Sequence, residues 1–325
     1  MSDPLFLGVD GGGSKTLAIV VDAQGQERGR GLAGSGNYQA VGAARALRAV
    51  RDAVTVALTM AHGHRPCRAA WLGLAGVDRA RDVALLLPRV RTLARTVRLT
   101  NDAELALGAL PEQVGVALIA GTGSIALGRD ARGRTARAGG WGHILGDEGS
   151  GYTMGRQALT AAVRAADGRA PATALLALIL AHWQLRAASE LIEQVYAHED
   201  KARIAALAPL VLQAARAGDP AAARIVRRAA RELALAAGTA SASLDLDATS
   251  CPLALGGGLL LHASGFRRAV LRRVRRAQAP GEYALVDHPA LSAARAATTI
   301  GAADDWRRTP EAGAAPTDRC EGGPT

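Results

Sequence analysis

Two glycine-rich segments of the sequence carry residues suited to phosphate chemistry. The first is Asp10-Gly11-Gly12-Gly13-Ser14-Lys15-Thr16, which joins two apolar runs typical of strands. Glycines let the backbone approach a ligand closely, and consecutive free N–H groups bind anions. Ser14, Lys15 and Thr16 add donors and a positive charge, and the Asp10 carboxylate at the strand end suits a hydrated Mg²⁺ ion. The segment predicts a phosphate loop with an associated metal.

The second segment, Gly121-Thr122-Gly123-Ser124, has the same design and again joins two strand-like runs. Neither segment fits the familiar nucleotide motifs. A P-loop needs a glycine directly before its lysine, where this chain has Ser14, and a dinucleotide fingerprint needs a helix after the turn, where a strand pattern follows. Each segment alone could be an ordinary hairpin turn. Two such loops in two similar halves predict a nucleotide clamped between domains.

Asp102 is the candidate general base. It follows the strand-like run 96–100 and precedes a helical pattern from Ala103 to Leu110. A carboxylate at the C-terminal end of a strand in an α/β unit is well placed to accept a proton. The same position suits a helix N-cap, which is the commoner role for aspartate there. Both roles stay open on local evidence, and the two phosphate loops favour the base.

A third segment, Gly139 to Gly151, contains too many glycines for a regular element. It holds Trp141, His143 and Asp147. Ligand sites combine an apolar platform with a few placed polar groups, and a sugar would find both in Trp141 and Asp147. We interpret the segment as a sugar-binding loop. For His143, a structural role in holding the loop is favoured over a direct role in catalysis.

The order of strand and helix patterns predicts an α/β fold. In the first half, strand patterns and one long helical run follow each other at 5–10, 17–22, 26–32, 40–60, 69–74 and 96–100. In the second half, strand patterns, a long interrupted helical region and a last strand lie at 115–120, 125–128, 152–243 and 251–255. Both halves begin with a hairpin whose first turn is glycine-rich, which is a weak internal repeat.

A chain of 325 residues that is nearly half hydrophobic has room for two domains. We expect an N-terminal domain at 1–114 and a C-terminal domain at 115–303. The first would carry the sugar side, the first phosphate loop and the general base. The second would carry the second phosphate loop and the adenosine side. Residues 304–325 are rich in Pro, Gly and Ala, and we expect a disordered tail.

Composition excludes several other classes of protein. The net charge is +10, but the arginines of the densest basic stretch, 267–276, spread around a helix, and no aromatic residues are interleaved with them. We therefore expect no nucleic-acid partner. The cysteines Cys67, Cys251 and Cys320 form no CxxC pair, which disfavours a disulfide framework or a metal cluster. The N-terminus lacks a signal peptide pattern and the longest apolar run is too short for a bilayer, so a cytoplasmic location without membrane contact is expected.

Taken in order, these segments resemble the N-acetylglucosamine kinases of the BadF/BadG/BcrA/BcrD ATPase family, within the sugar kinase–actin–Hsp70 superfamily. The matching motifs are Asp10–Thr16, Asn37, Asn101-Asp102, Gly121–Ser124, Gly139–His143 with Gly146–Ser150, and Leu255–Gly258. The match covers about residues 5 to 303. It implies two ribonuclease-H-like (actin-like ATPase) domains with an interdomain nucleotide cleft, the sugar beside the nucleotide, and a possible homodimer.

The resemblance also implies roles for single residues. Asp102 would be the general base and Asp10 the Mg²⁺-associated carboxylate. The residues implied to contact ATP are Gly12, Gly13, Ser14, Lys15, Thr16, Gly121, Thr122, Gly123, Ser124, Ala205, Gly256, Gly257 and Gly258. The residues implied to contact the sugar are Asn37, Asp102, Gly140, Trp141, Gly142 and Asp147.

The predicted activity is therefore ATP-dependent phosphorylation of the 6-hydroxyl of N-acetylglucosamine. The alternatives are a kinase for glucosamine or a related amino sugar, and an ATPase that drives a change in a partner protein. Ala75-Gly76-Val77 departs from the Ser-Gly-Gly of some relatives, which removes a polar sugar contact. The family's activator ATPases hold an iron–sulfur cluster with cysteines, and this sequence has no suitable cysteine motif.

Overall fold

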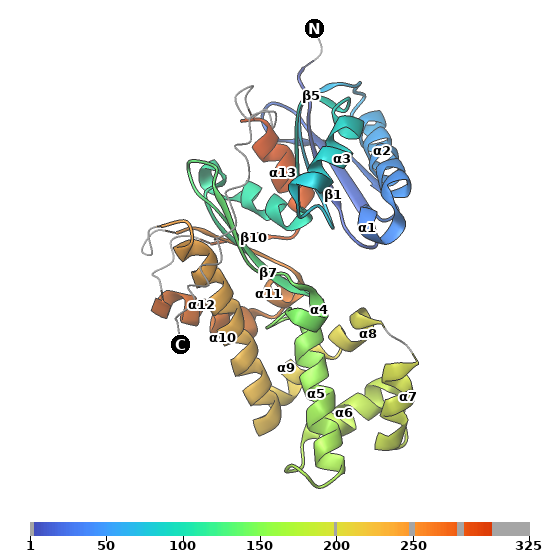
Figure 1. Ribbon diagram of the computed structural model, residues 1–325, viewed down its shortest axis with the longest axis vertical. Helices are drawn as coiled ribbons and strands as arrows, with labels where there is room; N and C mark the ends of the chain where they lie inside the picture. The colour runs from blue at the N-terminus through green and yellow to red at the C-terminus, as the bar shows by residue number, and fades with distance from the viewer. Residues whose placement is uncertain (1–2, 198–199, 247–250, 278–282, 301–325) are drawn as a thin grey trace, which may run out of the picture. The chain divides into compact units, whose positions relative to one another are not determined.

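The computed structural model describes residues 3–197, 200–246, 251–277 and 283–300 (Figure 1). The predicted tail at 304–325 lies outside these residues. The chain forms two compact units: unit 1 comprises the residues up to Leu105 together with the segment from Ala293 on, and unit 2 comprises Ala106–Ser292. Each unit contains one five-stranded sheet with helices, which confirms the predicted α/β class.

The sheet of unit 1 has the strand order β3-β2-β1-β4-β5. Its strands are β1 (Phe6–Gly11), β2 (Thr16–Val21), β3 (Glu27–Ala33), β4 (Cys67–Leu74) and β5 (Ala94–Thr100). The first three form an antiparallel meander, while β4 and β5 run parallel to β1. The C-terminal ends of β1, β4 and β5 therefore meet at one edge of the sheet, where Asp10 and Asp102 lie.

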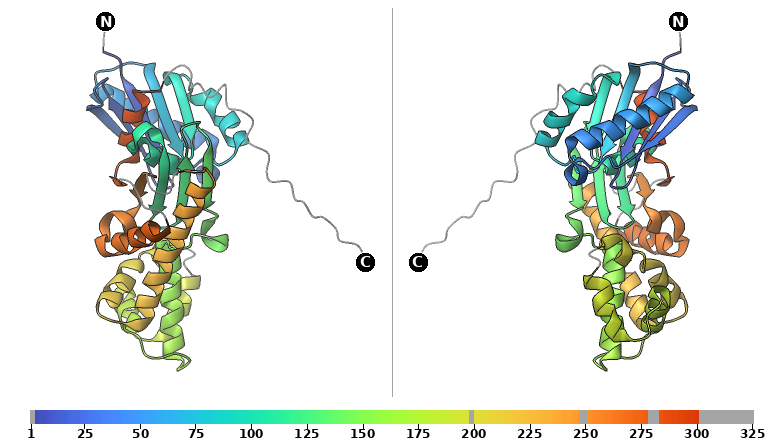
Figure 2. Two further views of the ribbon diagram at one scale, coloured as in Figure 1. Left: turned by 90° about the vertical axis from the view of Figure 1, so that its left-hand side faces the viewer. Right: turned by 90° about the vertical axis from the view of Figure 1, so that its right-hand side faces the viewer.

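The helices of unit 1 include α1 (Tyr38–Val41), α2 (Ala43–Met60) and α3 (Ala80–Val90). The apolar side of α2 is buried with the β-strands in one core, and the helix lies against the antiparallel part of the sheet (Figure 2). Its approach to β3 is close. A Cβ on Gly31 would lie 2.1 Å from the carbonyl oxygen of Ala53, so only glycine lets the helix pack at this distance.

The sheet of unit 2 repeats this arrangement, with the order β10-β9-β6-β7-β8. Its strands are β6 (Gly115–Ala120), β7 (Ser124–Arg129), β8 (Thr135–Gly139), β9 (Leu253–Gly256) and β10 (Tyr283–Val286). Again the first three are antiparallel, and β9 and β10 run parallel to β6 and to each other. The internal repeat predicted from the two glycine-rich hairpins is thus present at the level of topology.

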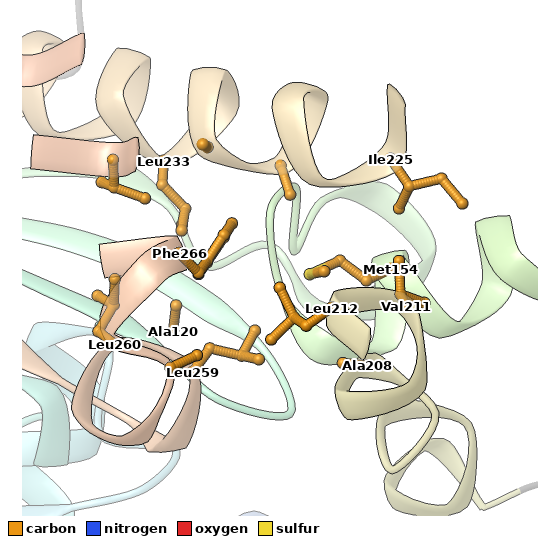
Figure 3. Close-up of a cluster of buried hydrophobic side chains, with 14 of the residues drawn as sticks. Ala120, Met154, Ala208, Val211, Leu212, Ile225, Leu233, Leu259, Leu260 and Phe266 are labelled. Carbon is orange, nitrogen blue, oxygen red and sulfur yellow. The ribbon is translucent and has the colours of Figure 1, made fainter. Parts of the chain in front are cut away.

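Most helices belong to unit 2. They are α4 (Gly142–Leu145), α5 (Gly151–Ala166), α6 (Ala174–Trp183), α7 (Leu191–Tyr196), α8 (Lys201–Ala205), α9 (Ala208–Arg216), α10 (Pro220–Ala242), α11 (Gly258–His262), α12 (Ser264–Ala277) and α13 (Pro289–Ala297), the last of which passes into unit 1. Side chains from α5, α9, α10 and α12 form one apolar core, in which Met154, Val211, Ile225 and Phe266 are buried (Figure 3). This core fixes α5 and α10 side by side (Figure 1).

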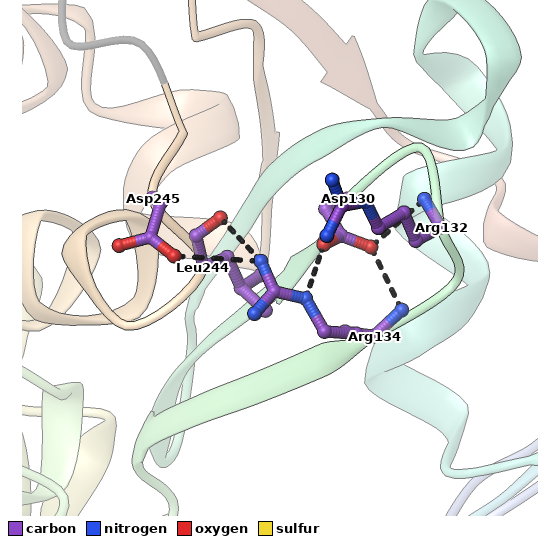
Figure 4. Close-up of polar contacts among 5 residues, drawn as sticks. All are labelled: Asp130, Arg132, Arg134, Leu244 and Asp245. Atoms are coloured by element: carbon purple, nitrogen blue, oxygen red, sulfur yellow. Dashed lines mark hydrogen bonds and ion pairs between the residues drawn. The ribbon is translucent and has the colours of Figure 1, made fainter. Parts of the chain in front are cut away.

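A polar cluster ties the β7–β8 turn to the end of α10 (Figure 4). The buried Asp130 accepts hydrogen bonds from the backbone of Arg132 and Arg134, and pairs with the Arg134 side chain at 2.6 Å. The guanidinium of Arg134 also donates to the carbonyl of Leu244 at 3.2 Å and lies 3.5 Å from a carboxylate oxygen of Asp245. The hairpin of the second sheet is therefore held to the longest helix of the unit.

The structure differs from the predicted organisation in several places. The strands β8 and β10 were not predicted, and the helix expected from Ala103 is a 3-10 segment, η1 (Asp102–Ala109). The units separate between Leu105 and Ala106, upstream of the predicted boundary at 114, because Leu105 packs beside Gly73 of β4. The chain also returns to unit 1 at its end, where the Arg295 guanidinium donates to the Gly25 carbonyl at 3.1 Å.

Among the described residues, no single helix has the length and apolar character needed to cross a membrane. Only the bent pair Ala174–Trp183 and Ala188–Tyr196, taken together across an angle of 63°, reaches that length and composition.

Candidate active site

The candidate site of unit 1 includes three residues that pair side by side across the strands β1, β4 and β5. Asp10 at the end of β1 pairs with Gly73 of β4, and Gly73 pairs with Thr100 of β5. Directly paired residues point to the same face of a sheet, so all three belong to the face opposite to the core that contains α2. The middle position of this row carries no side chain.

Gly73 makes room for Asp102. A Cβ at this glycine would lie 2.9 Å from the Cα of Asp102 and 2.5 Å from Cγ of Leu105. Real Cβ atoms do not approach other atoms so closely, and here one obstacle is backbone. The turn after β5 therefore passes directly over Gly73, which brings Asp102 toward Asp10.

The environment of the Asp102 carboxyl raises its pKa. Burial raises its pKa to about 6, a hydrogen bond from the Ala103 N–H opposes this rise, and the charge of Asp78 adds to it. The Ala103 N–H also lies 2.9 Å from the side-chain oxygen of Asn101, compared with 3.0 Å from Asp102. Asn101 thus shares the capping role that was the alternative for Asp102. A pKa near 6 leaves a carboxylate ionised at neutral pH yet more basic than an exposed one.

Asp10 is the most perturbed of the predicted site residues. Burial raises its pKa to about 7, the charge of Asp102 raises it further, and Lys15 acts in the opposite direction. In the part of the chain that the structure describes, no hydrogen bond reaches this carboxylate. A desolvated oxygen ligand without a protein partner fits a hydrated divalent cation, which prefers carboxylates and keeps several waters. Among the described residues, no group of three or more His, Cys, Asp or Glu side chains is suited to hold a metal ion.

The first glycine loop is held in place by its own neighbours. Gly12 donates to the Lys15 carbonyl at 3.0 Å, and Gly36 donates to the Gly12 carbonyl at 3.0 Å. The side chains of Ser14 and Lys15 and the backbone of Gly13 are exposed, as a phosphate contact requires. Thr16 differs from this expectation: it is 0% exposed and its hydroxyl donates to the Gly34 carbonyl at 2.8 Å. The structure therefore gives that side chain the role of fixing the loop.

Asn37 lies in unit 1 beside the end of β4. Its side-chain oxygen caps α1 by accepting from Gln39 and Ala40, and it lies 3.2 Å from the position of a Cβ on Gly76. Gly76 belongs to the loop after β4. Further along this loop, Asp78 accepts a hydrogen bond from the Asn101 amide at 2.8 Å. The loop after β4 thus connects Asn37 to the turn that carries Asp102.

The second glycine loop docks onto the start of α5 in unit 2. The N–H groups of Gly151 and Tyr152 donate to the carbonyls of Gly121 and Thr122 at 2.8 and 3.2 Å. The Ser124 hydroxyl is committed to the Glu148 carbonyl at 2.7 Å. Thr122 remains exposed, so this residue and the backbone of the turn are the parts of the loop that can meet a ligand.

Asp147 is bound to this loop. It is 5% exposed, has a positive φ of 61°, and accepts a hydrogen bond from the Ser124 N–H at 3.1 Å. A Cβ on Gly123 would lie 3.0 Å from both of its carboxylate oxygens. The predicted sugar contact of Asp147 stays a prediction, and the structure adds a second role, which is to shape the turn that precedes it in sequence.

The other predicted nucleotide residues of unit 2 gather around the same turn. A Cβ on Gly257 would lie 2.4 Å from the Ala120 carbonyl oxygen, and a Cβ on Gly121 would lie 3.7 Å from the Gly258 nitrogen. Ala205, at the end of α8, is in contact distance of Gly151. The turns after β6 and β9 are therefore neighbours, and the end of α8 lies beside Gly151, which the first of these turns contacts. The nucleotide contacts stay a prediction.

Trp141 lies in the third glycine segment and is 64% exposed. Gly140 donates to the Ser124 carbonyl at 3.1 Å, and Gly142 begins the short α4 with a φ of 80°. The guanidinium of Arg137 stacks on the Trp141 ring at 4.7 Å, and His143 contacts Tyr152 edge-on at 5.0 Å. Most of the indole is exposed, and its sugar contact stays a prediction. The contact of His143 with Tyr152 joins this segment to α5.

Three residues of unit 1 were missed by sequence reasoning: Gly73, Asp78 and Glu104. Burial raises the pKa of Glu104 to about 7, a hydrogen bond from the Asn101 backbone opposes the rise, and the charge of Asp78 adds to it. Functional residues of α/β units lie at or after the C-terminal ends of strands, which is how Asp102 was identified. The same reasoning applied to the end of β4 would have identified Gly73 and Asp78. For Glu104 the sequence offered no signal beyond its position two residues after Asp102.

The repeated sheet, with a glycine turn after the first strand of each copy, defines the actin-like ATPase class of proteins with two ribonuclease-H-like domains. The chain belongs to the BadF/BadG/BcrA/BcrD ATPase family, whose model matches residues 7–283. It is 34% identical to the N-acetylmuramic acid/N-acetylglucosamine kinase of Clostridium acetobutylicum over 78% of this chain and 85% of that protein. It is also 34% identical to the N-acetyl-D-glucosamine kinase of Dictyostelium discoideum, over 67% of this chain and 73% of that protein.

Solved structures agree with this assignment. A Chromobacterium violaceum protein, described as a candidate N-acetylglucosamine kinase, has a TM-score of 0.72 at 27% identity and covers 91% of this chain and 99% of its own. The hexokinase of Thermus thermophilus from the ROK family shares the fold with a TM-score of 0.54 at 21% identity, covering 90% of this chain and 98% of its own.

Proposed function

We propose that this protein is an ATP-dependent kinase that phosphorylates the 6-hydroxyl of N-acetylglucosamine. The observation that carries the proposal is the placement of Asp102 over Gly73, beside Asp10, in a chain of this ATPase family. The family supplies the expectation of ATP chemistry. The names of the two relatives at 34% identity point to an amino sugar as the acceptor.

In this proposal Asp102 accepts the proton of the sugar hydroxyl as the oxygen attacks the γ-phosphate of ATP. Its pKa of about 6 keeps the carboxylate ionised at pH 7 while leaving it a useful base. Asp10 would hold Mg²⁺ through its waters, and the ion would supply positive charge to the phosphates. Lys15, whose charge already acts on Asp10, is proposed to contact the same phosphates.

The proposed nucleotide contacts come from both units. In unit 1 they are the backbone of Gly12 and Gly13 and the exposed Ser14 and Lys15. In unit 2 they are Gly121, Thr122 and Gly123, with Gly256, Gly257, Gly258 and Ala205 on the adenosine side. Their support is that Gly13, Ser14 and Lys15 of unit 1 are exposed, and that in unit 2 a Cβ on Gly257 would lie 2.4 Å from the Ala120 carbonyl oxygen, so the turns after β6 and β9 lie side by side. Most of the catalysis would be positioning and electrostatic stabilisation.

The choice among amino sugars rests on the third glycine segment. Asn37, Gly140, Trp141, Gly142 and Asp147 are the proposed sugar contacts. The exposed indole of Trp141 offers an apolar surface for the acetyl methyl, worth roughly 1 kcal/mol, or about fivefold in kcat/KM. Glucosamine is the second candidate acceptor, because a Vibrio cholerae glucosamine kinase is 30% identical over 55% of this chain and 61% of that protein. A cytoplasmic location and a homodimer stay predictions.

The test is product analysis. The purified protein is incubated with Mg-ATP and, separately, N-acetylglucosamine, glucosamine, glucose or no sugar, and the products are identified by mass spectrometry and NMR. We expect a 6-phosphate of N-acetylglucosamine and ATP turnover that depends on the sugar. Equal ATP hydrolysis with and without sugars would overturn the kinase and favour the partner-driven ATPase. A preference for glucosamine would change only the acceptor, and Trp141→Ala should then affect both sugars equally.

A further inference from the structure

Unit 2 contains a groove that the proposed kinase chemistry does not use. Its volume is about 990 Å³, within the range of small-molecule sites. It lies among α5, α10, α12 and the segment that precedes α6. Six arginines line it: Arg164, Arg224, Arg227, Arg228, Arg231 and Arg273. Among the described residues that line it there is no aspartate or glutamate.

Four of these arginines form one stripe on α10. Arg224, Arg227, Arg228 and Arg231 stand at the spacing i, i+3, i+4 and i+7, which places them on one face of a helix. Like charges at these spacings repel each other and destabilise the helix. Arg164 of α5 and Arg273 of α12 add positive charge from the neighbouring helices. A bound anion would remove this repulsion.

Most of the stripe is available for such a ligand. Arg231 forms an ion pair with Glu232 at 3.0 Å, and Arg273 donates to the Ala269 carbonyl at 2.8 Å. Within the described residues, no hydrogen bond or ion pair engages the side chains of the other four arginines, Arg164, Arg224, Arg227 and Arg228.

The rest of the lining is mainly small and apolar. Ala161, Pro171, Ala221 and Ile225 contribute to it, and the described lining residues include no aromatic ring on which a nucleic-acid base could stack. The groove is concave, unlike a surface that rests on a membrane. Its chemistry suits a small molecule with an apolar body and several phosphoryl groups, because arginines bind phosphoryl oxygens through paired, charge-assisted hydrogen bonds.

We propose that this groove is a second binding site, separate from the glycine turns, for a small molecule that carries at least two phosphoryl groups. The groove shares Gln157 and Arg228 with a neighbouring cavity of about 420 Å³. That cavity is lined in part by His143, Ile144 and Leu145 of the third glycine segment. A ligand bound to Arg228 would therefore lie next to a cavity that this segment lines, and the site is placed to influence the segment that carries Trp141.

The binding test uses inorganic tripolyphosphate as the probe, measured by isothermal titration calorimetry on the full chain. The stripe variant replaces Arg224, Arg227 and Arg228 together with Gln. The matched control replaces Arg45, Arg48 and Arg51, three exposed arginines of α2, and so removes the same charge elsewhere. Binding at the glycine turns is common to all three proteins. We expect the stripe variant to lose one binding event, or to bind more than about tenfold more weakly, while the control matches wild type.

Equal binding by the stripe variant and wild type, or equal losses in the stripe variant and the control, would overturn the site. If the stripe variant does not fold, Arg164→Gln on the facing helix replaces it and should weaken the same binding event. Two further arms use anionic phosphatidylglycerol vesicles and a single-stranded oligonucleotide. Arginine-dependent binding to either one without tripolyphosphate binding would also overturn the proposal. Each outcome is independent of kinase activity, so the failure of one proposal is distinguishable from the failure of the other.

Discussion

The indole N–H of Trp71 donates a hydrogen bond of 2.9 Å to the hydroxyl of Thr100, two residues before Asp102. Both groups are buried, and the Thr100 hydroxyl donates a hydrogen bond to the Asn101 carbonyl at 3.1 Å. The guanidinium of Arg98 stacks over the indole ring at 3.9 Å. The end of β5 is therefore fixed by β4 through side chains as well as through the sheet, and the position of the candidate base depends on it.

Trp71→Phe tests this relationship. Phenylalanine keeps a ring for Arg98 to stack on but cannot donate to Thr100. We expect a loss of stability of about 1 kcal/mol and a fall in kcat of severalfold, because the turn with Asp102 gains freedom. Thermal denaturation and steady-state kinetics measure the two effects. A loss of stability with unchanged kcat would show that the bond holds the sheet and not the base.

Asp102→Asn tests the general base. The variant should keep ATP and sugar binding while kcat falls by about 10²–10⁴-fold. Asparagine caps a helix almost as well as aspartate, so a purely capping role predicts near-normal activity. Asp22→Asn is the matched control, since Asp22 is a buried turn residue of the same unit that accepts from the N–H groups of Gln24 and Gln26. A kcat within a few-fold of wild type for Asp102→Asn would remove its catalytic role.

Gly73→Ala tests how the base is placed. The new methyl group would displace the Asp102 backbone and Leu105, and we expect both kcat and stability to fall, the latter by about 1–3 kcal/mol. Gly238→Ala is the control. This glycine lies within α10 with nothing near its Cβ position, so alanine should stabilise the protein by about 0.5–1 kcal/mol and leave kcat unchanged. Normal activity of Gly73→Ala would contradict the close approach.

Paired substitutions of Asp147 separate its two roles. Asparagine keeps an oxygen for the Ser124 N–H and tolerates a positive φ, whereas alanine leaves that N–H without a partner in a buried place. We expect Asp147→Ala to weaken ATP binding by about tenfold or more, and Asp147→Asn to restore most of it. Calorimetry with a non-hydrolysable ATP analogue provides the measurement. Identical ATP affinities in both variants and wild type would assign Asp147 to the sugar alone.

The raised pKa of Asp10 predicts a pH dependence of stability in metal-free buffer. Its folded-state pKa of about 7 lies above the 3.8 of an ordinary aspartate, so the folded protein binds the additional proton between these values. The free energy of unfolding therefore falls as the pH rises from about 4 to 7. Asp10 accounts for on the order of 1–2 kcal/mol of this fall after solvent screening. Asp10→Asn should make the decline shallower, and Mg²⁺ should do the same for wild type only. Parallel pH profiles for both proteins would contradict this environment.

The sequence identified the residues at strand ends but not what surrounds them. Asp10 and the second glycine turn follow strongly apolar runs, Asp102 follows the strand-like run 96–100, and such patterns are readable without a structure. The role of Gly73 depends on its pairing with both neighbours, which no local pattern encodes. Thr16 and Ser124 looked like phosphate donors by type, yet tertiary contacts occupy their hydroxyls. The short β8 and β10 have weak patterns because their side chains are mostly exposed or half-buried.

Because Arg295 contacts Gly25 across 270 positions of sequence, unit 1 is assembled from both ends of the described chain. A ribosome releases the five strands of the first sheet long before it releases the last helix. During that interval unit 1 has to persist without its final segment, whose Ala293, Ala294 and Ala297 are buried in the finished protein. Unit 2 lies wholly between these two parts and is one continuous stretch of chain. The two sheets have the same topology but are completed in a different order during synthesis. Unit 1, whose strands are made first, is the unit that is completed last.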